Sequence, residues 1–294
     1  MSLADDGTVA QLIALAKRED LGAGDLTSGL LPQAGAIADF RLLAKQRGVF
    51  AGREIAPRVL NAYDPAILIE WNAVATDGAA IESPPVELAL IRGPLGAVLS
   101  AERVMLNFLQ RLSGVATLTR AFVNAAAGTG AKILDTRKTT PGWRALEKYA
   151  VRCGGGDNHR AGLFDAVLIK DNHLAGIPTD RLAEAVFQML NALSASGAAP
   201  AFIEVEATDL AQVDQLLKVV GIDVILLDNF SIAAMREAVA LRDGVGLRGK
   251  VALEASGGVS LATVRAIAET GVERISVGQL THSAAAIDLS LERI

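Results

Sequence analysis

The sequence predicts an α/β protein in which a small mixed α and β unit is followed by a barrel-like domain. The chain has 294 residues, 51% of them hydrophobic, which is enough for two cores of unequal size. Short apolar runs recur through the second half with helical patterns between them, and polar residues follow several of these runs. Strands that alternate with helices form parallel sheets, and this many units favours closure toward a barrel.

The first part of the chain predicts a helix, several strands and one long helix. Helical spacing of apolar residues begins at Val9 and ends at Arg18. Largely apolar segments that are typical of strands cover residues 36–44, 67–74 and 86–91. A helical pattern from Ser100 to Leu112 then closes this part, so we expect the first domain to cover residues 1–113.

The second part, residues 114–280, predicts the barrel. Its expected strands are the apolar runs 132–134, 166–169, 202–205, 224–227, 251–253 and 275–277. The segment from Gly176 to Pro200 contains no motif that we can interpret. Active sites of parallel barrels are assembled at the carboxyl ends of the strands. The polar residues that follow these runs are therefore expected to converge on one site.

Composition restricts the classes of partner and the compartment. The formal net charge of −5 argues against a surface for nucleic acid or an anionic membrane, since both need large positive fields. Charges interrupt every apolar run well before the roughly 20 residues that a membrane-spanning helix requires. Residues 1–20 are too acidic for a signal or transit peptide, and the single cysteine, Cys153, fits a reducing compartment. We therefore expect a cytoplasmic protein.

The expected site contains a dense group of cations for an acidic protein. The group consists of Arg137, Lys138, Arg160 and Lys170, with His159 beside them. Arginine forks suit carboxylate or phosphate oxygens, and lysine supplies a compact charge that can meet a pyrophosphate. The pattern indicates a substrate with several negative charges. The alternative is that these side chains are ordinary surface cations or form ion pairs with Asp135, Asp165 and Asp171.

Two carboxylates follow neighbouring strands of the expected sheet, Glu206 and Asp228. They could hold Mg²⁺ directly or through water, or stabilise the positive charge that develops on a sugar carbon as its leaving group departs. The third alternative is that either carboxylate pairs with one of the lysines. The sequence leaves these roles open.

Small residues late in the barrel predict a phosphate site. Ser256, Gly257 and Gly258 follow an expected strand, and Gly278 follows the next one. Backbone amides at such a turn can approach a phosphate closely. Gly154 to Gly156 are interpreted instead as a flexible bend before His159. For Cys153, His173 and His282 we expect packing or surface roles, since no nucleophile spacing can be justified.

The segment ILDTRKTTPGWRALEKYAVRCGGGDNHRAGLFDAVLIKDNH resembles the quinolinate phosphoribosyltransferase family, also called nicotinate-nucleotide pyrophosphorylase (carboxylating). The resemblance extends to EDLGAGDLTS, AERVMLNFLQRLSG, LLDNF, LEASGG and ISVGQLTHSAAAIDLSL, and so to nearly the whole chain. Gln279 departs from the small residue expected before LTHS. The resemblance implies an N-terminal α/β sandwich and an open, incomplete α/β barrel, with the last segment, 281–294, returning toward the first domain.

The resemblance also implies an activity and a set of site residues. The family transfers phosphoribosyl from phosphoribosyl pyrophosphate to quinolinate and releases CO2 and pyrophosphate, which gives nicotinate mononucleotide for de novo NAD biosynthesis without an organic cofactor. A homodimer with shared sites, or a larger homo-oligomer, is implied, in which Arg103 reaches the partner's site. Arg137, His159, Arg160 and Lys170 would hold quinolinate. The residues implied for phosphoribosyl pyrophosphate and its Mg²⁺ are Lys138, Thr139, Glu206, Asp228, Ser256, Gly257, Gly258 and Gly278, with Lys138, Glu206 and Asp228 as the catalytic groups.

Three alternatives remain open at this point. A protein associated with molybdenum transport shares the implied architecture, but the intact TRKTTPG, NHR and LIKDNH segments favour the enzyme. Nicotinate phosphoribosyltransferase handles a ring with one carboxylate and would not need so many cations. A non-catalytic binding protein would bind the same anions and form no mononucleotide.

Overall fold

A computed structural model of the chain describes residues 7–294. Residues 1–6, the start of the acidic N-terminal segment, lie outside the described residues. The chain divides into two compact units: the first contains the residues up to Arg120 together with Lys138–Gly156 and Leu280–Ile294, and the second contains Ala121–Arg137 and Asp157–Gln279. Beyond the expected residues 1–113 and the returning C-terminal segment, the first unit contains residues 114–120 and 138–156.

The first unit is built on an antiparallel sheet with the strand order β12-β1-β5-β3. The strands are β1 (Ile37–Ala44), β3 (Leu68–Trp71), β5 (Val86–Pro94) and β12 (Leu289–Arg293), and a separate ribbon pairs β2 (Gly48–Val49) with β4 (Ala80–Ile81). Exposed or half-buried positions alternate with buried ones along β1, so one face of the sheet is covered. The C-terminal strand completes this sheet by pairing with β1.

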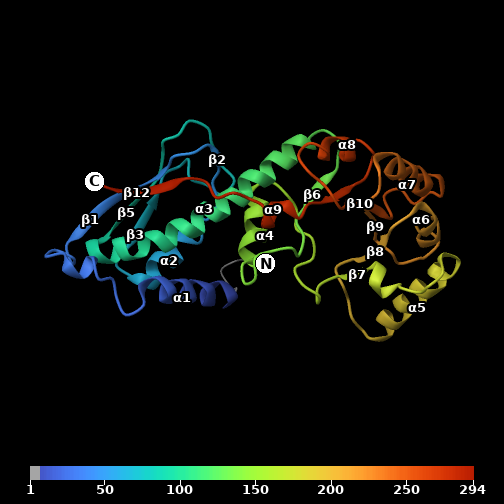
Figure 1. The fold of residues 1–294 in the computed structure, drawn as a ribbon, viewed down its shortest axis with the longest axis horizontal. Coiled ribbons are helices and arrows are strands. Elements are labelled where there is room, and N and C mark those ends of the chain that lie inside the picture. The colour runs from blue at the N-terminus through green and yellow to red at the C-terminus, as the bar shows by residue number, and fades with distance from the viewer. Residues whose placement is uncertain (1–6) are drawn as a thin grey trace. The chain divides into compact units, whose positions relative to one another are not determined.

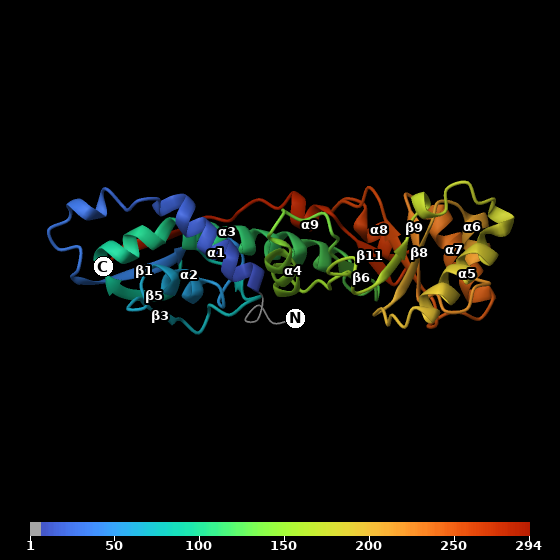
Figure 2. The same cartoon turned by 90° about the horizontal axis from the view of Figure 1, so that it is seen from below.

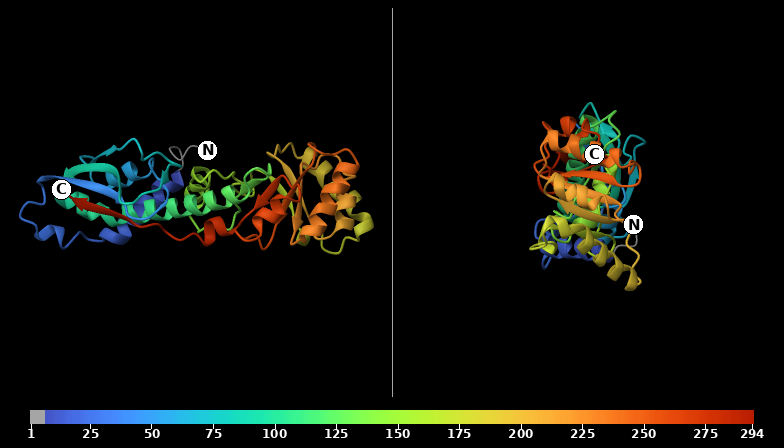
Figure 3. Two further views of the ribbon diagram at one scale, coloured as in Figure 1. Left: turned by 90° about the horizontal axis from the view of Figure 1, so that it is seen from above. Right: turned by 90° about the vertical axis from the view of Figure 1, so that its right-hand side faces the viewer.

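Helices cover one face of that sheet (Figures 1 and 3). The helices that begin in the first unit are α1 (Gly7–Leu21), α2 (Ala56–Tyr63), α3 (Leu95–Ala125) and α4 (Arg144–Cys153), and the short α9 (Gln279–His282) follows the last strand of the second unit. The predicted end of the long helix at Leu112 is wrong, because α3 continues through Gly114. A Cβ atom at Gly114 would lie 2.0 Å from the Ala285 carbonyl oxygen. This glycine permits close packing and does not end the helix.

The second unit contains a six-stranded parallel sheet with the order β6-β11-β10-β9-β8-β7. Its strands are β6 (Lys132–Leu134), β7 (Val167–Ile169), β8 (Ile203–Ala207), β9 (Val224–Asp228), β10 (Ala252–Ser256) and β11 (Arg274–Ser276). From β7 to β11 the strands lie side by side in chain order. Strand β11 then pairs with β6, so β6 and β7 form the two edges of the sheet. The sheet is therefore an open barrel, and both the α/β class and the six expected strands are confirmed.

Helices α5 (Leu182–Ala195), α6 (Leu210–Leu216), α7 (Ile232–Gly244) and α8 (Val264–Ala268) connect these strands. The first three lie together on one side of the sheet (Figures 1 and 2). Most residues of β8 and β9 are buried, as expected for strands covered on both faces. Within the described part of the chain, no helix is long and apolar enough to span a lipid bilayer.

Candidate active site

The carboxyl ends of the parallel strands bring several of the predicted residues to one face of the sheet. Ser256 pairs in register with Asp228, and Glu206 pairs with Leu226, two residues before Asp228. Side chains two residues apart on a strand point to the same face, so Glu206, Asp228 and Ser256 face the same side. Gly278 follows β11 at the same edge.

Two arginines lie close to each other at this end of the second unit. Arg137 follows β6, and Arg160 is only 8% exposed although it is charged. The pKa of Arg160 is lowered, first by burial and second by the positive charge of Arg137. Arg160 Nη1 also donates a hydrogen bond to the Ala166 carbonyl oxygen at 3.3 Å. Mutual repulsion of two guanidinium groups is relieved when an anion binds between them.

His159 is buried among charged groups. Its Nε2 atom lies 2.8 Å from Glu204 Oε2 and 3.4 Å from Glu254 Oε1. Its Nδ1 atom accepts a hydrogen bond from the Arg160 backbone N–H at 2.8 Å. Both ring nitrogens therefore have protein partners in this conformation, which the sequence did not predict.

The imidazole is subject to opposing influences on its protonation. Burial alone would lower the pKa of His159, but the hydrogen bonds and charges of Glu204 and Glu254 outweigh it and raise this pKa to about 9. The Arg160 N–H opposes full protonation, since a ring that accepts a hydrogen bond at Nδ1 carries its proton on Nε2 alone. In either form Nε2 carries a proton, and it lies 2.8 Å from the nearest Glu204 carboxylate oxygen.

Lys170 and Glu206 form an ion pair across neighbouring strands. Lys170 Nζ lies 3.3 Å from Glu206 Oε2, and the lysine side chain is 48% exposed while that of Glu206 is 7% exposed. One of the alternatives for Glu206, that it pairs with a lysine, is therefore present in the structure. The exposed lysine remains accessible to an anion from solvent.

The predicted phosphate turn has a strained, closely packed backbone. Gly257 has a φ of +88°, and a Cβ atom there would lie 2.1 Å from Asn229 Oδ1. Asn229 itself has a φ of 56° and donates its backbone N–H to the Ser256 carbonyl oxygen at 2.9 Å. Left-handed backbone at a residue other than glycine is uncommon in proteins, and the instances cluster at functional sites. The turns after β9 and β10 are thus built against each other.

Three predicted residues lie in the first unit. Arg103 is exposed on α3. The Lys138 carbonyl oxygen accepts a hydrogen bond from Thr281 Oγ1 at 2.8 Å, and Thr139 Oγ1 accepts one from Arg144 Nε at 3.1 Å. The loop that carries Lys138 and Thr139 is therefore held by side chains on both sides.

A buried carboxylate that the sequence did not predict, Glu147, also supports this loop. It is fully buried and accepts hydrogen bonds from Thr140 N and Thr140 Oγ1, each at 3.0 Å. Arg111 Nη2 lies 2.7 Å from Glu147 Oε1 and also donates to the carbonyl oxygen of Thr281. A fully buried carboxylate needs such partners. These contacts hold the backbone around Lys138, and they run from Thr281 through Arg111 and Glu147 to Thr140.

The glycines before His159 and the single cysteine have packing roles. Gly154 is buried where α4 ends, and a Cβ atom there would lie 2.6 Å from the Ala116 carbonyl oxygen. Close approach, more than flexibility, therefore explains this glycine. Burial, followed by the negative charge of Asp77, raises the pKa of Cys153 to about 12, so the thiol is protonated at neutral pH.

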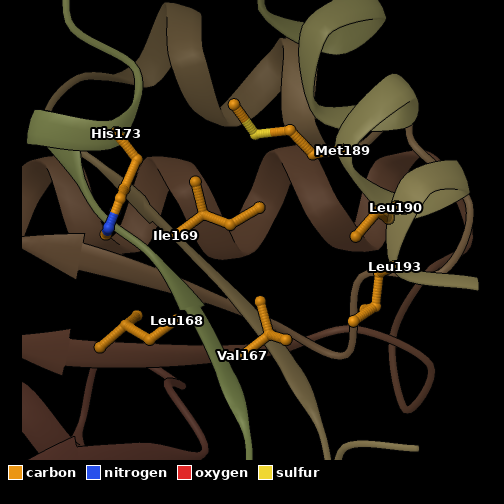
Figure 4. Close-up of a pocket in the computed structure, with 7 residues that line it drawn as sticks. All are labelled: Val167, Leu168, Ile169, His173, Met189, Leu190 and Leu193. Atoms are coloured by element: carbon orange, nitrogen blue, oxygen red, sulfur yellow. The ribbon is translucent and has the colours of Figure 1, made fainter. Parts of the chain in front are cut away.

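The other two histidines make local contacts. His173 Nδ1 accepts the Lys170 backbone N–H at 2.8 Å, and His282 Nδ1 lies 2.7 Å from Ser283 Oγ. His173 also lines an apolar cavity of about 450 Å³ between β7 and α5 (Figure 4). The remaining lining residues are Val167, Leu168, Ile169, Met189, Leu190 and Leu193. This apolar lining does not suit a substrate with several negative charges.

The sequence matches two protein-family models that together cover most of the chain. Residues 25–113 match the quinolinate phosphoribosyl transferase N-terminal domain, and residues 115–292 match the C-terminal domain of the same family. The nicotinate-nucleotide pyrophosphorylase [carboxylating] of Mycobacterium leprae is 42% identical over 286 residues, which cover 95% of each chain. The quinolinate phosphoribosyltransferase [decarboxylating] 1b of Nicotiana tabacum is 38% identical over 294 residues, 96% of this chain and 81% of that protein.

A solved structure shows the same architecture. The nicotinate-nucleotide pyrophosphorylase of Francisella tularensis superposes with a TM-score of 0.86 at 38% identity, over 98% of this chain and 96% of that one. Sequence identity at this level, over nearly the full length of both chains, indicates membership of one family and not only a shared fold. The chain belongs to the quinolinate phosphoribosyltransferase family.

Proposed function

We propose that this protein transfers the phosphoribosyl group of phosphoribosyl pyrophosphate to quinolinate with decarboxylation, which forms nicotinate mononucleotide, CO2 and pyrophosphate. This is the nicotinate-nucleotide pyrophosphorylase (carboxylating) reaction of de novo NAD biosynthesis. Family membership over both domains supports it. The structural observation that carries the proposal is the neighbouring pair Arg137 and Arg160 in an acidic protein. Such a pair suits a substrate with two carboxylates.

Quinolinate is proposed to bind at the carboxyl end of the barrel strands. Arg137 and Arg160 supply two guanidinium forks for its carboxylates, and Lys170 adds an exposed charge at the end of β7. His159 completes the group by its contact with the Arg160 backbone. We propose that nicotinate binds more weakly, because its single carboxylate leaves one arginine without a partner.

Phosphoribosyl pyrophosphate is proposed to bind along the turns that follow β8 to β11. Ser256, Gly257, Gly258 and Gly278 offer backbone amides and small side chains to a phosphate. Lys138 and Thr139 keep their predicted roles at the pyrophosphate. Glu206 and Asp228 would hold Mg²⁺, directly or through water, since both are oxygen donors on one face of adjacent strands. Bound Mg²⁺ would supply neutralisation of the pyrophosphate charge.

The chain's own residues then act mainly by positioning and by electrostatics. The arginines orient the ring so that its nitrogen can form the bond to the ribose carbon that pyrophosphate leaves. Lys138 offsets charge on the departing group, and Glu206 and Asp228 face the positive charge on the sugar carbon. Once the ring nitrogen is quaternised, it stabilises the carbanion that remains when the 2-carboxylate departs as CO2, and a proton from solvent then completes nicotinate mononucleotide.

The assembly and the compartment belong to the same proposal. The exposed position of Arg103 on α3 is compatible with a role in the site of a second copy of the chain, in a homodimer or a larger homo-oligomer. A cytoplasmic location fits the single reduced cysteine. Neither nucleic acid nor a membrane is proposed as a partner.

The proposal is tested by incubating the purified protein with phosphoribosyl pyrophosphate, Mg²⁺ and either quinolinate or nicotinate. We expect nicotinate mononucleotide from quinolinate only, measured by chromatography of the products. A faster reaction with nicotinate would identify a salvage enzyme. Binding of quinolinate without product would instead support a non-catalytic protein.

A further inference from the structure

A fully buried polar cluster lies beneath the proposed quinolinate residues. Glu204 on β8 and Glu254 on β10 have no exposed surface, and both approach His159 Nε2, at 2.8 and 3.4 Å. Arg274 on β11 is the register partner of Glu254 and donates from Nε to Glu254 Oε2 at 2.6 Å. Neither Glu254 nor Arg274 has a role in the function proposed above.

An aromatic ring completes this cluster. The Phe202 and His159 rings make an edge-to-face contact, with their centroids 5.4 Å apart and an interplanar angle of 79°. The Arg274 guanidinium lies 5.1 Å from the centroid of the same ring. Cation–π and edge contacts of this kind fix the planes of the groups that make them. The imidazole and the guanidinium are therefore held on a shared ring as well as by carboxylates.

The same three side chains could in principle hold a metal ion, because ligand atoms of His159, Glu204 and Glu254 lie within 4.8 Å of one another. The hydrogen bonds argue against it. A metal on Nε2 needs the ring proton on Nδ1, but the Arg160 N–H already points at Nδ1. Arg274 also occupies Glu254 Oε2. The cluster is therefore better described as a charged support, in which Arg274 holds Glu254 and the imidazole of His159 lies near both carboxylates.

This support spans the open side of the barrel. The segment before His159 is attached to β6, since Asp157 bridges to Leu134 and Asp135 accepts hydrogen bonds from the His159 backbone N–H and from Asn158 Nδ2. From that edge the imidazole reaches carboxylates on β8 and β10. The next residue in the chain is Arg160, whose backbone N–H is bound to the imidazole. The orientation of the ring therefore determines the position of the Arg160 backbone, from which the guanidinium side chain extends.

We propose that Glu254, held by Arg274, is a positioning residue for quinolinate binding that acts through His159 on Arg160. This inference rests on the proposed function, since it assumes that Arg160 binds quinolinate. Glu254 lies two residues before Ser256 on β10, on the same face but deeper along the strand, so its influence is indirect. Loss of the Glu254 carboxylate releases one side of the imidazole and allows Arg160 to leave its binding orientation.

The test uses the full-length protein with Glu254→Gln and with the double variant Glu254→Gln/Arg274→Gln. The double variant removes both charges, so it stays informative if the single variant fails to fold with an unpaired arginine. Glu269→Gln is the matched control, because Glu269 pairs with Arg265 at 2.6 Å in the same unit, the distance at which Arg274 pairs with Glu254, but lies outside the cluster. Removing a support behind a functional histidine typically costs about tenfold or more. We expect the KM for quinolinate to rise about tenfold in both variants. The KM for phosphoribosyl pyrophosphate in these variants should change less than about twofold. Both KM values of the control variant should also change less than about twofold.

A spectroscopic measurement separates positioning from general damage. The chain has three histidines, so ¹⁵N spectra of selectively labelled protein resolve the His159 ring. We expect Nε2 of His159 to be protonated in the wild type, and averaging between ring forms in the Glu254 variants. An unprotonated Nε2, or a shift of its resonance when Mg²⁺ or Zn²⁺ is added alone, would overturn the inference. So would a folded variant with a disturbed ring and an unchanged quinolinate KM. An inactive wild type with the expected ring form would refute the proposed function instead.

Discussion

Glu147→Ala should destabilise the protein strongly, although the residue lies in a helix whose sequence looks ordinary. The Glu147 carboxylate is fully buried, and it bonds Arg111 Nη2 at 2.7 Å and two groups of Thr140 at 3.0 Å. The Arg111 side chain is only 25% exposed, so it would be left as a largely buried charge. Removing one partner of such a pair costs about 3–5 kcal/mol of unfolding free energy.

The assay is thermal unfolding followed by calorimetry at pH 7. At about 2 °C per kcal/mol for a chain of this size, the unfolding temperature should fall by about 6–10 °C. Lys218→Ala is the control, because the Lys218–Asp214 pair has the same 2.7 Å distance but side chains that are 55% and 52% exposed. An exposed pair contributes about 0–1 kcal/mol. If Glu147→Ala fell no further than Lys218→Ala, the support of the Lys138 loop by this carboxylate would be refuted.

Three further results are expected from the structure. Burial raises the pKa of Cys153 to about 12, so iodoacetamide at pH 8 should label the urea-unfolded chain and not the native one, and Cys153→Ala should retain turnover; rapid native labelling would contradict the packing role. Hydrogen bonds from Ser28 and Ser100 lower the pKa of Asp25 to about 2, so its stabilising contribution is complete above the unfolded pKa of about 4 and is lost as pH falls toward 2. The difference in unfolding midpoint between the wild type and Asp25→Asn should therefore shrink between pH 5 and pH 2, and a constant difference would argue against the assignment. Gly257→Ala should reduce activity far more than Gly249→Ala, since both glycines have positive φ but only a Cβ at Gly257 meets a neighbour, at 2.1 Å; equal effects would show that the contact with Asn229 is unimportant.

The barrel strands were predictable because each is a short apolar run between helical patterns. The run at 132–134 coincides with β6, and the others differ from the observed strands by a few residues at their ends. Strand ends are determined by pairing with neighbours, which a single segment does not encode. The helix predicted to end at Leu112 continues to Ala125. Gly114 does not end it, because this glycine allows a close backbone contact with Ala285, which is remote in sequence.

The site residues divide in the same way. Charged residues after strands were visible as polar interruptions, so Arg137, Lys170 and Asp228 could be found from the sequence. The partners of His159 could not, because they are determined by which strands lie opposite one another. A signal was nevertheless present, since Glu204 and Glu254 stand between apolar residues of buried strands, where a charge requires a partner.

The most direct test of the central claim follows the carboxylate that the reaction removes. Quinolinate labelled with ¹³C in its 2-carboxyl group would be incubated with the protein, phosphoribosyl pyrophosphate and Mg²⁺, and labelled CO2, nicotinate mononucleotide and pyrophosphate would be measured together. The account predicts equal amounts of all three products and no labelled CO2 when phosphoribosyl pyrophosphate is omitted. Label that remains in the nucleotide, or no nucleotide at all, would contradict it.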